Sequence, residues 1–157
     1  MADKLHLLRD ELRDLDRAAG HLRLSIDRTR ELSARDASGP EELERLEALA
    51  SRFARLSDLL TQRVMRLVDE VELLTPGTLL DRIRRAEKRG WVDEAARLVR
   101  IRELRNLIAH EYASEKLAGI YAAVITLAPE LLAVVPKVQT YAQDLINKYP
   151  VSPDERT

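Results

Sequence analysis

The feature that most constrains this chain is a set of long apolar stripes with helical spacing. Between Leu5 and Ile26 apolar residues recur every three or four positions, and a second stripe extends from Leu43 to Leu74. This spacing gives a helix one apolar face and leaves charged residues on the other. Ala, Leu, Glu and Arg dominate, whereas aromatic residues make up only 4% of the chain, a balance that favours helices over sheets. We therefore predict an all-α fold.

Turn signals separate the two long helices. The first should stop within residues 34–39, because Pro40 suits the first turn of a new helix. The second should extend to about Leu74, where Thr75-Pro76-Gly77 supplies a turn.

The second half of the chain contains shorter predicted helices. Thr78 and Asp81 resemble a capping box that opens a short helix ending near Gly90. Further helices are expected from Trp91 to about Glu111, over residues 115–126, and from Pro129, which starts or kinks the last stretch, to Tyr149. The pattern predicts an up-and-down bundle of four main helices plus a short one, with residues 1–149 as a single domain and 150–157 as a disordered tail.

Composition excludes several classes of protein. The absence of cysteine excludes a disulfide scaffold, a thiolate zinc site and a cysteine nucleophile, and we expect neither a metal nor a cofactor. The first residues lack the apolar stretch of a signal peptide, so a cytoplasmic location is expected. The apolar segment 119–138 contains two prolines, a glutamate and a lysine, which favour buried helix over a membrane span.

Charge is unevenly distributed. The whole chain has a net charge of −1, but residues 81–112 contain nine basic and six acidic side chains. This excess indicates either an ordinary solvated helix face or a local anion-binding surface.

One histidine stands in a distinctive context. His6 and His21 have no acidic or serine partner at a catalytic spacing, and we expect them at the surface. His110 belongs to the run RNLIAHEY, in which Arg105 precedes it by five positions and Tyr112 follows it by two.

This run resembles the signature of HEPN domains, in which an arginine precedes a histidine by a short spacer, and in particular the R-x4-H-x-Y form of HepT-like toxins. Residues 51–70 and 77–90 also resemble small helical bacterial proteins of this group. Residues 128–131 resemble their Leu-Pro-x-Leu entry to the last helix, with Ala128 in place of the usual leucine.

The resemblance implies a homodimeric, metal-independent endoribonuclease that forms the toxin half of a toxin–antitoxin pair. The partner would be an MntA-like nucleotidyltransferase that adds AMP to the motif tyrosine. Carried over to this chain, Arg105 and His110 would be catalytic, Asn106 would support them or bind RNA, and Tyr112 would be AMPylated. Arg102, from the basic segment, is a further candidate RNA-binding residue.

The residue types suit cleavage of RNA by its own 2′-hydroxyl. Histidine can transfer protons near neutral pH, and a guanidinium stabilises phosphate charge. In one regular helix, however, Arg105 and His110 would lie about 140° apart around the axis and about 7.5 Å apart along it. Either the helix loosens near His110, or two subunits form a composite site across a two-fold axis. We favour the homodimer.

Two other functions compete with the ribonuclease. The chain could be a non-catalytic HEPN-like partner or substrate-binding subunit of a nucleotidyltransferase, or a purely structural adaptor. In a structural role, Arg105 would pair with a carboxylate such as Glu103 of a partner chain, His110 would interact with the end of its helix, and Tyr112 would lie in the core.

Overall fold

A computed structural model describes residues 1–32, 39–75, 77–110 and 114–149. The described residues form helices and turns, with no strand among them. The elements are α1 (Ala2–Thr29), α2 (Pro40–Asp58), the π-helical segment η1 (Leu59–Val64), α3 (Met65–Val71), α4 (Leu79–Lys88), α5 (Ala95–His110) and α6 (Ser114–Asn147). Because α2, η1 and α3 follow one another without a break, the predicted bundle of four main helices plus a short one is confirmed. The predicted tail, 150–157, lies outside the described residues.

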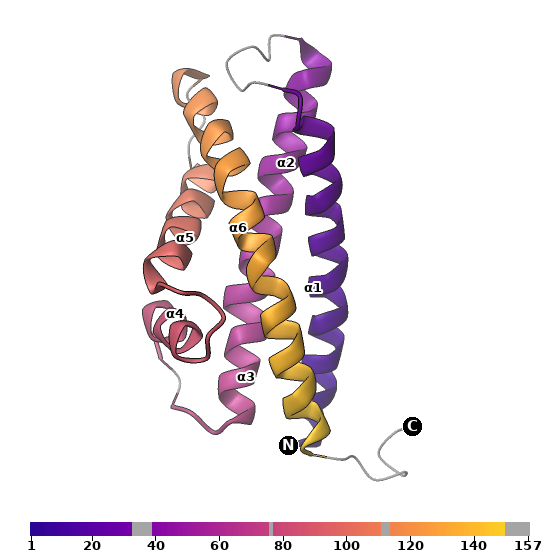
Figure 1. The fold of residues 1–157 in the computed structure, drawn as a ribbon, viewed down its shortest axis with the longest axis vertical. Coiled ribbons are helices and arrows are strands. Elements are labelled where there is room, and N and C mark those ends of the chain that lie inside the picture. The colour runs from indigo at the N-terminus through magenta and orange to yellow at the C-terminus, as the bar shows by residue number, and fades with distance from the viewer. Residues whose placement is uncertain (33–38, 76, 111–113, 150–157) are drawn as a thin grey trace.

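The helices pack lengthwise around one core. α1 lies along α2, α6 crosses both, and α5 and α4 complete the bundle on the other side (Figure 1). The predicted stripes form the core: Leu8, Leu15 and Leu22 of α1 are fully buried, and Leu46 and Phe53 of α2 lie against them in the same cluster. The two ends of the second stripe are exceptions, since Leu43 is 39% and Leu74 38% exposed.

α6 corrects one expectation, because residues 114–147 form one helix rather than two. Pro129 and Pro136 lie inside it and both are exposed. A proline removes one backbone N–H, and on the solvent face the carbonyl that loses its partner can bind water. On the other face, Leu131 and Val135 are fully buried and hold the helix against the bundle.

α6 is also the most apolar helix. By length and composition, Glu115–Asn147 could cross a membrane, with a mean hydropathy of 1.9 in its most apolar window and 39% of that window buried. In the bundle, α6 packs against α1, α2 and α5, so its apolar face also has a place in the core.

Two helices end with the same backbone motif but with different residues. In α4, the N–H groups of Gly90 and Trp91 donate to carbonyls of the last turn, and Gly90 has a φ of +79°. α3 ends with equivalent bonds from Leu73 and Leu74, and Leu73 has a φ of +60°. These are Schellman motifs, in which a residue in the left-handed region closes the helix. Gly90 suits that region, whereas Leu73 is strained there.

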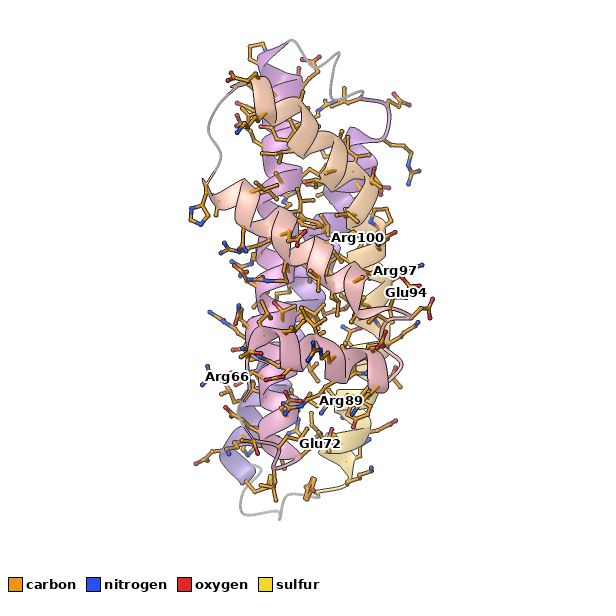
Figure 2. The ribbon with its side chains drawn as sticks, turned by 90° about the vertical axis from the view of Figure 1, so that its left-hand side faces the viewer. Arg66, Glu72, Arg89, Glu94, Arg97 and Arg100 are labelled. Carbon is orange, nitrogen blue, oxygen red and sulfur yellow. The ribbon has the colours of Figure 1, made fainter. Side chains whose placement is uncertain are left out.

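The short helix α4 lies across the bundle axis and is anchored by arginines (Figure 2). Its first turn has the predicted capping box, in which Thr78 and Asp81 exchange side-chain to backbone hydrogen bonds of 2.9 and 3.2 Å. At the other end, Arg85 and Arg89 form ion pairs of 2.9 and 2.8 Å with Asp69 of α3, which is 5% exposed. The Arg89 guanidinium also lies 5.0 Å from the ring centroid of Trp91. These contacts fix α4 against α3.

Candidate active site

The motif arginine lies between α5 and α2. Arg105 donates from Nε to Oδ1 of Asp58 at 2.7 Å and from Nη2 to Oδ2 at 2.9 Å. This fork is the side-on geometry in which a guanidinium fits a carboxylate. It leaves Nη1 and one hydrogen of Nη2 without a hydrogen bond to other described residues, and the Arg105 side chain is 27% exposed. Arg105 is therefore held on one edge and has donors left on the other.

A second arginine shares the same carboxylate. Arg102 is 7% exposed, and its Nη1 donates to Asp58 at 2.7 Å and to the Ser57 hydroxyl at 3.1 Å. Its Nε is buried without a hydrogen bond among the described residues. Two guanidinium groups on one carboxylate leave this part of α5 with a net positive charge.

The cluster shifts the pKa values of its members. Burial acts to raise the pKa of Asp58, but the hydrogen bonds and positive charges of Arg105 and Arg102 outweigh it, so the pKa lies below its usual value. The hydrogen bond to Asp58 raises the pKa of Arg105, against the effect of burial. Asp58 is thus a carboxylate and Arg105 a cation throughout the physiological pH range.

The motif histidine lies on another side of the same helix. α5 is helical through His110, so the described residues show no loosening of the helix up to that position, and residues 111–113 lie outside the described part of the chain. A regular helix places His110 about 140° around the axis from Arg105, and the two side chains do not converge within one chain. His110 and Asn106 are exposed, and the imidazole has no ion pair or hydrogen bond to described residues. Tyr112 lies outside the part of the chain that the structure describes.

The π-helical segment places a third arginine next to the cluster. Arg82 of α4 donates from Nη1 to the Thr61 carbonyl at 2.9 Å and to the Gln62 side chain at 3.2 Å. Desolvation lowers the pKa of Arg82, and the nearby Arg66 and Arg102 lower it further. The negative charge of Asp69 acts in the opposite direction. Arginines of α3, α4 and α5 are therefore close enough to affect one another, and two of the three belong to the positive segment 81–112.

Other basic residues of this segment project from α5 at some distance from the cluster. Figure 2 shows Arg97 and Arg100 along one edge of the helix, with Arg66 at the opposite edge of the molecule. Both Arg97 and Arg100 are exposed. The basic residues of segment 81–112 therefore form two groups: an ordered cluster that faces α2 and solvated side chains on the opposite side of α5.

Sequence reasoning missed Asp58, the residue that orients the arginines. No local signal indicated it, because the apolar stripe continues from Phe53 through Leu56 to Leu60 past this position. Pairing of Asp58 with Arg105, 47 positions away, cannot be read from local spacing. A structural role predicted a carboxylate partner for Arg105, and Asp58 of the same chain is such a partner. A pairing with Glu103 of a partner chain stays a prediction, and Glu103 is exposed.

The described residues contain no group of three His, Asp or Glu side chains arranged to hold a metal ion. Comparison of the chain with family models, with curated proteins and with solved structures finds no match.

Proposed function

We propose that this chain is a metal-independent endoribonuclease, acting as a homodimer and as the toxin of a HepT/MntA-like toxin–antitoxin system. The observation that carries the proposal is the Asp58 fork, which orients Arg105 and leaves its outer donors available to a phosphate. The exposed His110 on the same helix supplies a group that can transfer protons.

The reaction requires an oriented cation and a proton carrier. The 2′-hydroxyl of the RNA attacks the adjacent phosphorus, the bond to the 5′-oxygen breaks, and a 2′,3′-cyclic phosphate and a 5′-hydroxyl form. A fixed guanidinium stabilises the charge of the transition state because little reorganisation is needed at the moment of reaction. Histidine transfers the proton that leaves the 2′-hydroxyl or the one that the leaving oxygen takes up.

The divergence of Arg105 and His110 supports a dimer. Because one intact helix aims them at different sides, a shared phosphate would meet Arg105 of one subunit and His110 of the other. Asn106 and Arg102, both predicted to support catalysis or bind RNA, lie in different surroundings. Asn106 is exposed on the same side as His110, whereas Arg102 is buried and supports Asp58 rather than reaching RNA directly.

The partner is proposed to be a nucleotidyltransferase that inactivates the toxin by adding AMP to Tyr112. The transferred phosphate would place a negative charge near the arginine that binds RNA. Of the other tyrosines, Tyr121 is only 6% exposed and is a poor acceptor, whereas Tyr149 is 40% exposed but lies outside the motif. Mass spectrometry after incubation with such a partner and ATP should therefore locate AMP on Tyr112; AMP found only on another tyrosine would contradict the assignment.

Incubation of purified protein with defined RNAs in EDTA tests the enzyme directly. The wild type should release products with 2′,3′-cyclic phosphate ends, and Arg105→Ala and His110→Ala should abolish cleavage while helicity and dimer mass are unchanged. Arg100→Ala, an exposed arginine on the same helix, is the matched control and should retain activity. Wild-type rates in either motif variant would show that the site is wrong.

A non-catalytic subunit of a nucleotidyltransferase is the alternative; in that case the bonds from Arg102 and Arg105 to Asp58 would only fasten α5 to α2. Expression in bacteria separates the two functions. Growth arrest relieved by His110→Ala indicates the ribonuclease, whereas a harmless wild type that forms a complex with the nucleotidyltransferase indicates the alternative.

A further inference from the structure

A hollow of about 430 Å³ opens between α2, the end of α5 and the beginning of α6. Its walls are mostly apolar and are lined by Ala50 and Ala54 of α2, Ile108 of α5, and Leu117, Ile120 and Tyr121 of α6. Ser51 and Glu47, on the same side of α2, add a hydroxyl and a carboxylate. We call this space the α2–α5–α6 hollow.

The hollow lies near the arginine cluster along both α2 and α5. Ala54 lies four residues before Asp58 on α2, and Ile108 lies three residues after Arg105 on α5, so each is on the same face of its helix as the paired residue. α2 and α5 run in opposite directions (Figure 1), so both steps lead toward the same end of the bundle. The hollow therefore begins about one helical turn, roughly 5.4 Å, from the Arg105–Asp58 pair.

The lining suits a planar ring with a polar edge. Small alanines make room, and the branched side chains of Ile108 and Ile120 offer apolar surface. Glu47 can accept hydrogen bonds at the rim. Burial of the Tyr121 hydroxyl raises its pKa and the negative charge of Glu47 raises it further, so this hydroxyl stays protonated at neutral pH. Unstacked RNA bases are bound by such combinations of apolar contact and hydrogen bonds to their edges.

We propose that the α2–α5–α6 hollow receives the nucleobase next to the phosphate held by Arg105, and that it prefers guanine. Guanine is the base that matches the lining, because its adjacent ring N–H and amino group present two donors that fit the two oxygens of a carboxylate such as Glu47. The inference rests on the proposed function for the identity of the ligand, and it adds a base preference to a cleavage reaction that would otherwise depend on the phosphate alone.

Two measurements test the proposal, and the first of them does not depend on catalysis. The first is the binding of short 2′-O-methyl oligonucleotides, which cannot be cleaved by their own 2′-hydroxyl, with a single guanine or a single uracil in a pyrimidine sequence. The full-length wild type should bind the guanine oligonucleotide about ten-fold more tightly, in keeping with the discrimination that one bidentate hydrogen-bonded contact to a base provides. The second is sequencing of cleavage products from randomised RNA, which should show guanine enriched at one position beside the cut.

Ala54→Phe, which fills the hollow, should remove both preferences. The matched control is Ala96→Phe, an exposed alanine of α5 that lines none of the hollows near the site; it should leave them unchanged. Should Ala54→Phe fail to fold, Ser51→Phe provides the same obstruction from an exposed position. Glu47→Gln should reduce the guanine preference while the hollow still accepts a base.

The outcomes separate this inference from the proposed function. Guanine-selective binding without cleavage of any RNA would support the base-binding role of the hollow and contradict the ribonuclease proposal. Cleavage without a base preference, or a guanine preference that Ala54→Phe does not remove, would contradict the base-binding role of the hollow but not the ribonuclease proposal. A loss of dimer mass in Ala54→Phe, measured by light scattering, would assign the hollow to a second subunit and would also overturn the proposal.

Discussion

Replacement of Asp58 by asparagine tests whether this carboxylate organises the arginine cluster. Asp58→Asn keeps the shape of the side chain but removes the charge that accepts bonds from Arg102 and Arg105. Exposed ion pairs contribute about 0–1 kcal/mol, whereas removal of one partner from a buried pair costs about 3–5 kcal/mol. The Asp58 side chain is 37% exposed and the Arg102 side chain is 9% exposed. The expected cost therefore lies between the value for an exposed pair and the value for a buried pair. We expect a loss of about 2 kcal/mol in the free energy of unfolding.

Thermal and urea unfolding followed by circular dichroism measure this loss. For a chain of this length, about 2 kcal/mol corresponds to a fall in Tm of about 4–8 °C. The control is Asp10→Asn, since Asp10 pairs with Arg13 at 3.7 Å and both side chains are 68% exposed; its effect should be below about 0.5 kcal/mol. Equal effects of the two substitutions would refute the reasoning.

The pH dependence of the Asp58 contribution has a defined sign. Because the folded protein lowers the pKa of Asp58, the stabilisation is complete above the unfolded value of about 3.9 and is lost as the pH falls through the lower folded value. The difference in stability between wild type and Asp58→Asn should therefore be full at pH 7 and shrink below about pH 4. A difference that stays constant down to pH 3 would show that the carboxylate charge is not the cause.

Four further substitutions, each measured by urea unfolding, test helix ends and the anchoring of α4. Leu73→Gly should stabilise the protein by up to about 1 kcal/mol, because glycine adopts the φ of +60° without strain. Gly90→Ala should destabilise it by a similar amount, because its φ of +79° disfavours a side chain although there is space for a Cβ. Destabilisation by Leu73→Gly, or stabilisation by Gly90→Ala, would contradict the strain argument. Thr78→Ala should cost about 1 kcal/mol through loss of the capping box, and no effect would show that the box is dispensable. Arg89→Ala should cost about 3 kcal/mol because it removes a cation from the buried Asp69; a loss below about 1 kcal/mol would mean that Arg85 suffices.

Local patterns in the sequence determined the helical fold. The spacing of the leucines predicted the buried faces of α1 and α2, because a helix turns by a fixed angle per residue. The capping box at Thr78 and the left-handed Gly90 were predictable for the same reason, since each depends on residues within one or two turns. The residues of the candidate motif were also visible in the sequence, as was the divergence of Arg105 and His110 on a regular helix.

Contacts between distant segments were decided only by the tertiary structure. The pairing of Asp58 with Arg102 and Arg105 joins helices more than 40 positions apart, and the α2–α5–α6 hollow depends on how three helices meet. The continuity of α6 is a similar case, because burial of one face outweighs the two prolines on the other. In each case the free energy comes from burial and charge pairing across the bundle, and no window of neighbouring residues contains both partners.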